Sequence, residues 1–150
     1  MQDRKIILLV EDEVLIAEYE KRILIKFGYE VIISKSGEDA VEQIKKNNHI
    51  DLVLMDINLK TGIDGTEAAK QILKIRHIPI IFLTSHTEKE YVERVRKITR
   101  YGYIIKDSGD FVLKTSIEMA FELFESNRKL LEAKNKIEES EEKFKIVYKL

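Results

Sequence analysis

The sequence predicts an α/β fold: a five-stranded parallel sheet covered by helices on both faces, followed by an extended C-terminal helix. Five short apolar runs alternate along the chain with five segments of helical periodicity. Such alternation implies that parallel strands are joined by right-handed helical crossovers. From about Asp110 onward the pattern is helical to the end of the chain.

The expected strands are short and rich in aliphatic and β-branched residues. They cover residues 6–10, 31–33, 52–55, 80–83 and 103–105. The first, IILLV, is continuously apolar, which is typical of a strand that is buried on both faces. Pro79, the single proline of the chain, directly precedes the fourth strand.

The expected helices are indicated by apolar residues at three- and four-residue spacing and by their capping residues. The apolar stripes of the first three helices are Ile16, Tyr19, Ile23 and Phe27; Ala40, Val41 and Ile44; and Ala68, Ala69, Ile72 and Leu73. Gly28 is a typical helix stop. Ser36 with Asp39, and Thr87 with Glu90, resemble capping boxes at the starts of the second and fourth helices.

Composition excludes several classes of protein. The chain has 150 residues, 44% of them apolar and 35% charged, which suits one soluble domain with an appendage. A net charge of −1 argues against a broad nucleic-acid surface, and the absence of cysteine excludes disulfides and thiolate metal sites. The N-terminal apolar run is too short for a signal peptide or a membrane span, so we expect a cytoplasmic protein without membrane attachment.

Chemically active side chains follow the expected strands. Glu11 and Asp12 follow the first strand, Asp56 the third, Thr84 the fourth and Lys106 the fifth. Carboxyl ends of parallel strands form the ligand site in open α/β sheets, so these residues are expected to converge if the first and third strands are neighbours.

Converging carboxylates need a counter-ion. Two unit charges about 4 Å apart repel by roughly 4 kcal/mol at an effective dielectric constant near 20. Oxygen ligands without cysteine or histidine favour a hard cation, and Mg²⁺ fits best. A divalent cation, an ammonium and a hydroxyl around one carboxylate form a receptor for a phosphoryl group. Asp56 can then act as the nucleophile that becomes an aspartyl-phosphate.

Five ordered motifs resemble the response-regulator receiver domain of two-component signalling. They are ILLVEDE, LVLMDINL, DG at Asp64 and Gly65, PIIFLTS and YGYIIKD, and they cover roughly residues 4–124. The resemblance implies a flavodoxin-like sheet with strand order 2-1-3-4-5. It also implies a phosphorelay function, in which a histidine kinase or phosphotransfer protein donates the phosphoryl group.

The resemblance assigns a metal-binding and acceptor role to four positions. Asp12 would bind Mg²⁺ directly and Glu11 would bind it through water. Asp56 would bind the metal and accept the phosphoryl group, and the backbone carbonyl of Asn58 would complete the protein ligands.

Three further positions would carry the signal. Lys106 would pair with the phosphoryl oxygens, and Thr84 would hydrogen-bond to the phosphorylated acceptor. Tyr103 would rotate inward behind Thr84, changing the surface of the fourth helix, fifth strand and fifth helix.

The chain departs from the usual receiver pattern in the loops around this site. Asp107 stands where the family usually has a proline, often in a cis peptide, and it adds a negative charge beside the phosphate site. Lys60 replaces the usual proline four residues after the acceptor. The loop NLKTGIDG is also about one residue longer than is common.

We divide the chain into a receiver domain, residues 1–124, and a charged signalling helix, residues 125–150. In the second part Leu130, Ala133, Ile137, Ser140, Phe144 and Val147 form a heptad-like stripe. An ordinary amphipathic helix lying on its own domain is the alternative. The segment SEEKFKIVYKL resembles the entry to a PAS sensor domain. We therefore expect the N-terminal receiver part of a larger protein such as a hybrid sensor kinase, with a homodimer contact through this helix or through the switch surface.

Two other functions remain open from the residues. One is a degenerate receiver that acts only as a docking module, which the Asp107 departure favours. The other is a Mg²⁺-dependent nucleic-acid enzyme of the Toprim kind, although its second acidic pair would here be Asp56 and Asn58. No phosphate loop of the GxxxxGK[ST] type and no helix-turn-helix segment occurs, so we expect neither ATP hydrolysis nor DNA binding. The chain is not a conventional enzyme, beyond self-catalysed phosphotransfer and dephosphorylation.

Overall fold

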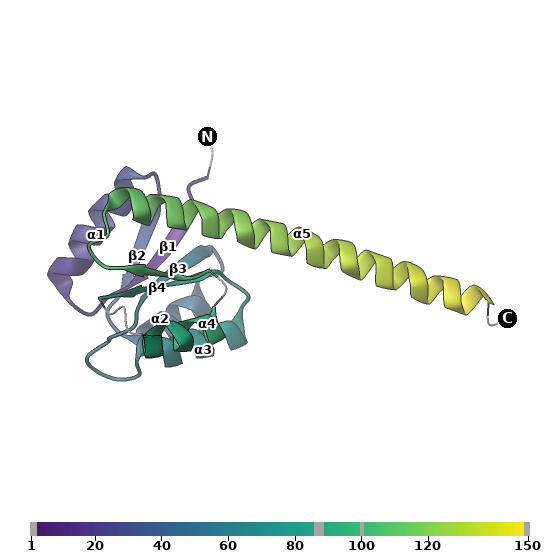
Figure 1. Ribbon diagram of the computed structural model, residues 1–150, viewed down its shortest axis with the longest axis horizontal. Helices are drawn as coiled ribbons and strands as arrows, with labels where there is room; N and C mark the ends of the chain where they lie inside the picture. Colours follow the sequence, from purple (N-terminus) through teal and green to yellow (C-terminus); the bar gives the residue numbers. More distant parts are fainter. Residues whose placement is uncertain (1–2, 86–88, 100, 149–150) are drawn as a thin grey trace.

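The computed structural model describes the backbone of residues 3–85, 89–99 and 101–148. Within these ranges the elements follow the alternation that the sequence predicts (Figure 1). The expected capping pair of Thr87 and Glu90 lies outside the side chains that the structure describes.

The sheet has five parallel strands in the order β2-β1-β3-β4-β5, as expected. The strands are β1 (Ile6–Val10), β2 (Glu30–Ser34), β3 (Ile50–Asp56), β4 (Ile80–Thr84) and β5 (Tyr103–Ile105). β1 and β3 are neighbours, with Val10 opposite Met55. The ends of β1 and β3 therefore meet at one edge of the sheet, which is the condition for a shared site.

Helices cover both faces of the sheet (Figure 1). They are α1 (Val14–Lys26), α2 (Gly37–Lys46), α3 (Gly65–Ile75), α4 (Lys89–Ile98) and α5 (Asp110–Tyr148). α2, α3 and α4 pack one face in a core that includes Ile44, Ile72 and Val95. α1 and α5 pack the other face through Leu24 and Ile117. Alternate strand residues supply both cores because successive side chains point to opposite faces.

Local signals fix the helix ends. The Ser36 hydroxyl accepts a hydrogen bond from the Asp39 amide at 3.0 Å, which confirms the predicted cap of α2. Asp64 caps α3 in the same way, accepting from the Glu67 amide at 2.9 Å. Gly28 has a φ of 99° after α1, a conformation that only glycine adopts without strain.

The apolar stripe of α1 includes one residue that is largely exposed. Tyr19 is 64% exposed, whereas Leu24 is fully buried and Glu20 is partly buried. The inward face of α1 is therefore rotated toward Glu20. An amphipathic tyrosine can lie outside the core, so the spacing of apolar residues alone misplaces the centre of the stripe.

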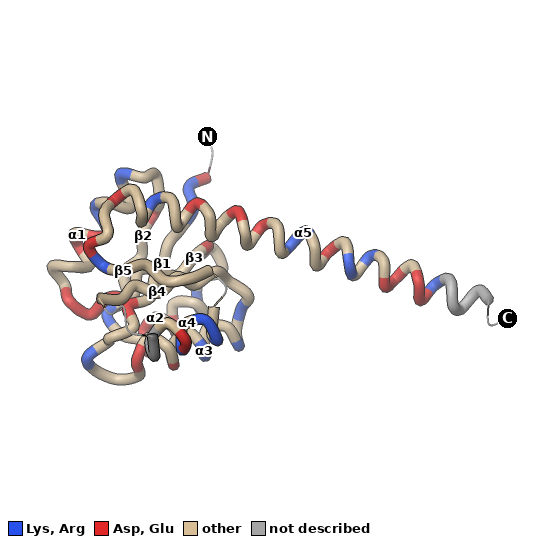
Figure 2. Tube along the Cα trace, in the orientation of Figure 1, with Lys and Arg blue, Asp and Glu red and all other residues tan. Residues whose placement is uncertain are grey.

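The final helix continues well beyond the sheet (Figure 1). α5 has 39 residues, and every side chain from Arg128 to Lys143 is exposed. Acidic and basic residues are interspersed along this extension (Figure 2). Over the described ranges, none of the helices is both long enough and apolar enough to cross a membrane.

Candidate functional site

Four predicted residues meet at the carboxyl edge of the sheet. Asp56 and Thr84 are the last residues of β3 and β4, while Glu11 and Lys106 directly follow β1 and β5. Asp56, Thr84 and Glu11 are only 3%, 1% and 1% exposed. Asp56 thus ends a buried strand because the chain places a carboxylate at the sheet edge, where parallel strands form their ligand sites.

Lys106 joins the two most buried acids. Its Nζ lies 3.1 Å from Glu11 Oε2 and 3.3 Å from Asp56 Oδ2. Burial lowers the pKa of Lys106, but the charges of Asp56 and Glu11 outweigh it, so its pKa is raised. Burial and the charge of Asp56 raise the pKa of Glu11, whereas Lys106 opposes that shift. The site is therefore a buried charge network with one cation for two carboxylates.

Asp12 brings a third carboxylate to the same place. Ligand oxygens of Glu11, Asp12 and Asp56 all lie within 4.8 Å of one another. Three carboxylates without a sulfur or imidazole donor make a donor set for a hard, oxygen-binding cation such as Mg²⁺. One ammonium does not balance this charge, so the residues present fit a divalent cation.

The loop after β3 is tied to these acids through backbone amides. The Asn58 amide donates to Asp56 Oδ1 at 3.0 Å, and the Lys60 amide donates to Asp12 Oδ2 at 2.9 Å. A proline at position 60 would lack that donor, so the departure from the family pattern has a structural consequence. The Lys60 ammonium also pairs with Glu13 at 2.7 Å on the surface.

Gly65 permits this loop to close against the acceptor strand. Its amide donates to the Ile57 carbonyl at 3.1 Å. A Cβ atom built at Gly65 would lie 2.1 Å from the carbonyl oxygen of Asp56. A side chain at this position would collide with backbone, so the start of α3 and the end of β3 require glycine here.

Two further positions of interest lie near Lys106 in sequence, Tyr103 and Asp107. Tyr103, three residues before it, is 37% exposed. Asp107, immediately after it, has a φ of 66°, in the left-handed region. Proline is restricted to a φ near −65°, so it could not adopt this loop conformation. Asp107 is compatible with it, because aspartate visits the left-handed region more readily than most residues.

Sequence reasoning missed one acid close to the site. Glu20 on α1 is partly buried, and its Oε2 atom is buried without a hydrogen-bond partner among the described residues. Burial, with a smaller contribution from the charge of Glu11, raises the pKa of Glu20 to about 7. Its spacing of four residues from Ile16 and three from Ile23 was the available signal, because it places Glu20 on the inward face.

Comparison with known proteins identifies the class to which this fold and site belong. A family model of the response regulator receiver domain matches residues 7–118. The chain therefore belongs to the response regulator receiver family. Receiver domains of this family act in phosphorelay signalling with histidine kinases or phosphotransfer proteins, and they generally bind Mg²⁺ at an acidic pocket.

Individual relatives agree with this assignment. The chain is 34% identical over 119 residues to the transcriptional regulatory protein PdtaR of Mycobacterium tuberculosis, a match covering 79% of this chain and 57% of PdtaR. It therefore spans less than two thirds of that relative. It is 35% identical to the polar-differentiation response regulator DivK of Brucella abortus, covering 68% of this chain and 84% of DivK.

One similar solved structure is matched by this chain over nearly the whole length of the solved domain. It is the N-terminal domain of a response regulator/sensory box/GGDEF three-domain protein from Carboxydothermus hydrogenoformans. The TM-score is 0.76 and the identity 46%, covering 82% of this chain and 98% of that one. Family membership favours the receiver over the Toprim-like alternative, and it leaves the docking-only receiver to be decided by phosphorylation.

Proposed function

We propose that Asp56 of this chain accepts a phosphoryl group from a phosphohistidine of a kinase or phosphotransfer protein. The observation that carries the proposal is the Asp56 carboxylate, which is 3% exposed and lies 3.3 Å from the Lys106 ammonium. An Asp56 oxygen forms the new P–O bond. The P–N bond breaks, and its electron pair leaves with the imidazole.

The acids around Asp56 support a bound Mg²⁺ ion in this reaction. Asp12 would bind it directly, Glu11 through water, and Asp56 and the Asn58 carbonyl would complete the protein ligands. Bound Mg²⁺ would neutralise charge on the phosphoryl oxygens. Lys106 would exchange its ion pair with Asp56 for one with a phosphoryl oxygen. Its ammonium already lies beside the acceptor carboxylate, so little movement would be needed.

Beryllofluoride tests whether the site takes up a phosphoryl-like group. In the presence of Mg²⁺ it is expected to shift the backbone amide NMR signals of Asp56, Thr84 and Lys106. Signals over α4, β5 and α5 should follow if the switch surface responds. Unchanged signals at Asp56 in folded protein with Mg²⁺ would favour the docking-only receiver.

Replacing Asp12 is expected to weaken Mg²⁺ binding. Asp12→Asn removes one of three clustered carboxylates, so the dissociation constant should rise about tenfold or more. Calorimetric titration with Mg²⁺ checks this value. Glu13→Gln is the matched control, because Glu13 is adjacent but outside the cluster. Equal losses in the two variants would show that general surface charge, rather than the cluster, attracts the ion.

Replacing Lys106 is expected to separate metal binding from switching. Lys106→Ala retains all three clustered carboxylates, so Mg²⁺ should still bind. The phosphoryl oxygens lose their cation, however, and the shift at Tyr103 with beryllofluoride should shrink or vanish. The comparison uses the amide NMR spectra of both proteins. A full-sized Tyr103 shift in the variant would refute the role of Lys106 in coupling.

Thr84 and Tyr103 are the proposed switch pair. Asp56 pairs with Leu83 across β3 and β4, and Thr84 is the residue that follows Leu83 at the end of β4. The Lys106 amide donates to the Thr84 carbonyl at 2.8 Å, which ties the acceptor edge to β5. Tyr103 lies on the same strand, 37% exposed, so inward rotation would alter the α4-β5-α5 surface.

The domain division and the larger context are also proposals. Residues 1–124 would form the receiver and residues 125–150 a signalling helix that leads toward a sensory domain of the PAS kind. The similar domain from Carboxydothermus hydrogenoformans stands before a sensory box in a three-domain protein, which supports this context. A hybrid sensor kinase remains one form that the larger protein could take.

We further propose that α5 forms a homodimer contact with a second copy of the chain. Exposed apolar residues follow one heptad frame from the sheet into the extension: Val112, Met119, Leu123, Leu130 and Ile137. Spacings of seven and four residues keep them on one face of the helix. Ser126, Ala133 and Ser140 occupy the alternate positions of the frame and predict a modest affinity.

Two neighbouring leucines test the dimer. Leu130 and Leu131 are 69% and 57% exposed, but only Leu130 lies in the heptad frame. Sedimentation equilibrium, at protein concentrations as high as those used for NMR, should give the mass of a dimer for the wild type and for Leu131→Glu. It should give the mass of a monomer for Leu130→Glu. A monomeric wild type, or equal effects of the two substitutions, would overturn this contact.

A further inference from the structure

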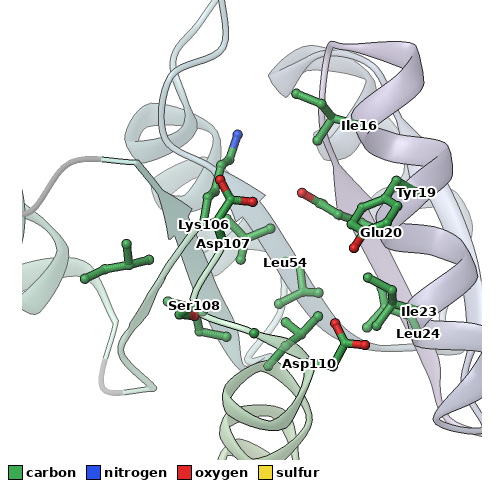
Figure 3. Close-up of a pocket in the computed structure, with 15 residues that line it drawn as sticks. Ile16, Tyr19, Glu20, Ile23, Leu24, Leu54, Lys106, Asp107, Ser108 and Asp110 are labelled. Carbon is green, nitrogen blue, oxygen red and sulfur yellow. The ribbon is translucent and has the colours of Figure 1, made fainter.

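A pocket of about 360 Å³ lies between α1 and the loop that follows β5 (Figure 3). Its size is within the range of small-molecule sites in proteins. The apolar walls come from α1, the sheet and the start of α5: Ile16, Ile23, Leu24, Leu54, Ile104 and Leu113. The pocket lies beside the acceptor edge and shares Lys106 with it, but Asp12, Asp56 and Thr84 do not line it.

The polar part of the pocket is predominantly acidic. Glu20 faces the loop of Lys106 and Asp107 across the pocket, and Asp110 lies at its other end (Figure 3). Among the described lining residues Lys106 is the single cation, and its ammonium is paired with Glu11 and Asp56. A ligand in this space would therefore meet carboxylates that the protein does not neutralise itself.

Glu20 is the group that most needs a partner. Its Oε2 atom is buried and accepts no hydrogen bond within the described part of the chain. A buried acceptor without a donor costs stability, and burial raises the pKa of Glu20 to about 7. A cationic donor would satisfy the oxygen and favour the charged carboxylate.

We propose that this pocket binds a small organic cation: a protonated amine that carries an apolar body. The ammonium group would donate to Glu20, and the apolar body would occupy the space between Ile23, Leu54 and Leu113. An anion would meet repulsion from three acids. A bare metal ion would find aliphatic walls where it needs further oxygen ligands. Binding depends on the pocket alone and does not require phosphorylation of Asp56.

A pair of matched probes tests the proposal on the wild-type chain. 2-Phenylethylamine is a cation at neutral pH, and 2-phenylethanol is its neutral counterpart of nearly equal shape. The amine should bind about tenfold to a hundredfold more tightly, as expected for a charge-assisted hydrogen bond. NMR titration should place the shifts at residues 16–24 and 104–113. No saturable binding of the amine, or equal affinity for both probes, would overturn the proposal.

Two substitutions on α1 locate the charge. Glu20→Gln keeps the size of the side chain and should remove the preference for the amine, leaving alcohol binding unchanged. Glu18→Gln is the control, because Glu18 is exposed on the same helix and does not line the pocket. Both variants are compared with the wild type by their amide spectra to confirm the fold. Retained amine preference in Glu20→Gln would refute the assigned contact.

Discussion

Asp56→Asn is expected to take up no phosphoryl group from labelled acetyl phosphate under conditions in which the wild type is labelled. The amide that replaces the carboxylate has no nucleophilic oxygen anion to form the acyl phosphate. The effect should be all-or-none, because Asp56 carries the reaction itself while its neighbours hold the metal and the phosphoryl oxygens. The measurement is the radioactivity that stays bound to each folded protein after free label has been removed.

The control must separate the loss of the acceptor from the loss of the fold. Asp56→Asn leaves Lys106 paired with the second buried acid, Glu11, and removes the repulsion between the two acids, so the variant should stay folded, which its free energy of unfolding checks. Asp39→Asn removes an exposed acid on α2 and should be labelled normally. Labelling of Asp56→Asn at the wild-type level would place the acceptor elsewhere.

Gly65→Ala is expected to lower the free energy of unfolding by about 3 kcal/mol, a large effect for one methyl group. The new Cβ would lie 2.1 Å from the Asp56 carbonyl oxygen and 2.9 Å from Ile57 Cα. Both contacts are with backbone, so relief requires movement of the chain segment that carries Asp56. Urea unfolding followed by circular dichroism measures the loss, and phosphoryl acceptance should fall with it.

Gly28→Ala separates collision from the general cost of replacing glycine. Gly28 has a positive φ of 99°, but a Cβ atom there would meet nothing within 4 Å. The left-handed conformation alone should cost about 1 kcal/mol. A loss for Gly65→Ala no greater than that for Gly28→Ala would mean that the acceptor loop yields easily, contrary to the tight closure described above.

Much of the fold could be predicted because it depends on patterns that are local in sequence. The apolar runs marked every strand, and β5 was predicted at its observed bounds, Tyr103–Ile105. β3 and β4 each proved to include the polar residue at their end, Asp56 and Thr84. These residues complete the hydrogen-bonded ladder before the chain turns, so polarity alone placed the strand ends too early.

The contacts within the site could not be predicted from spacing. Lys106 bridges Glu11 and Asp56, which are 95 and 50 positions away in sequence, because β1, β3 and β5 end at the same edge. The resemblance to receiver domains supplied the roles of these residues, whereas distances and burial needed the structure. The contact of the Lys60 amide with Asp12 was hidden in the same way, since backbone donors carry no residue signature.

Glu20 shows where hydrophobic periodicity is misleading. Tyr19 belongs to the apolar stripe of α1, yet it is 64% exposed, whereas the neighbouring acid Glu20 is partly buried. When the inward face of a helix is predicted from apolar residues alone, a buried acid on that face is left out of the prediction. Such an acid is informative when the structure reveals it, because burial without a partner indicates a ligand or a functional role.

The mass of the intact wild-type protein after incubation with acetyl phosphate and Mg²⁺ tests the proposed phosphoryl acceptance most directly. We predict the addition of one phosphoryl group, absent when Mg²⁺ is chelated and absent in Asp56→Asn. If the phosphate is too short-lived to detect by mass, the beryllofluoride titration followed by amide NMR tests whether the Asp56 carboxylate takes up a phosphoryl-like group. Folded protein that gains neither group in the presence of Mg²⁺ would contradict the proposal and identify the chain as a docking module.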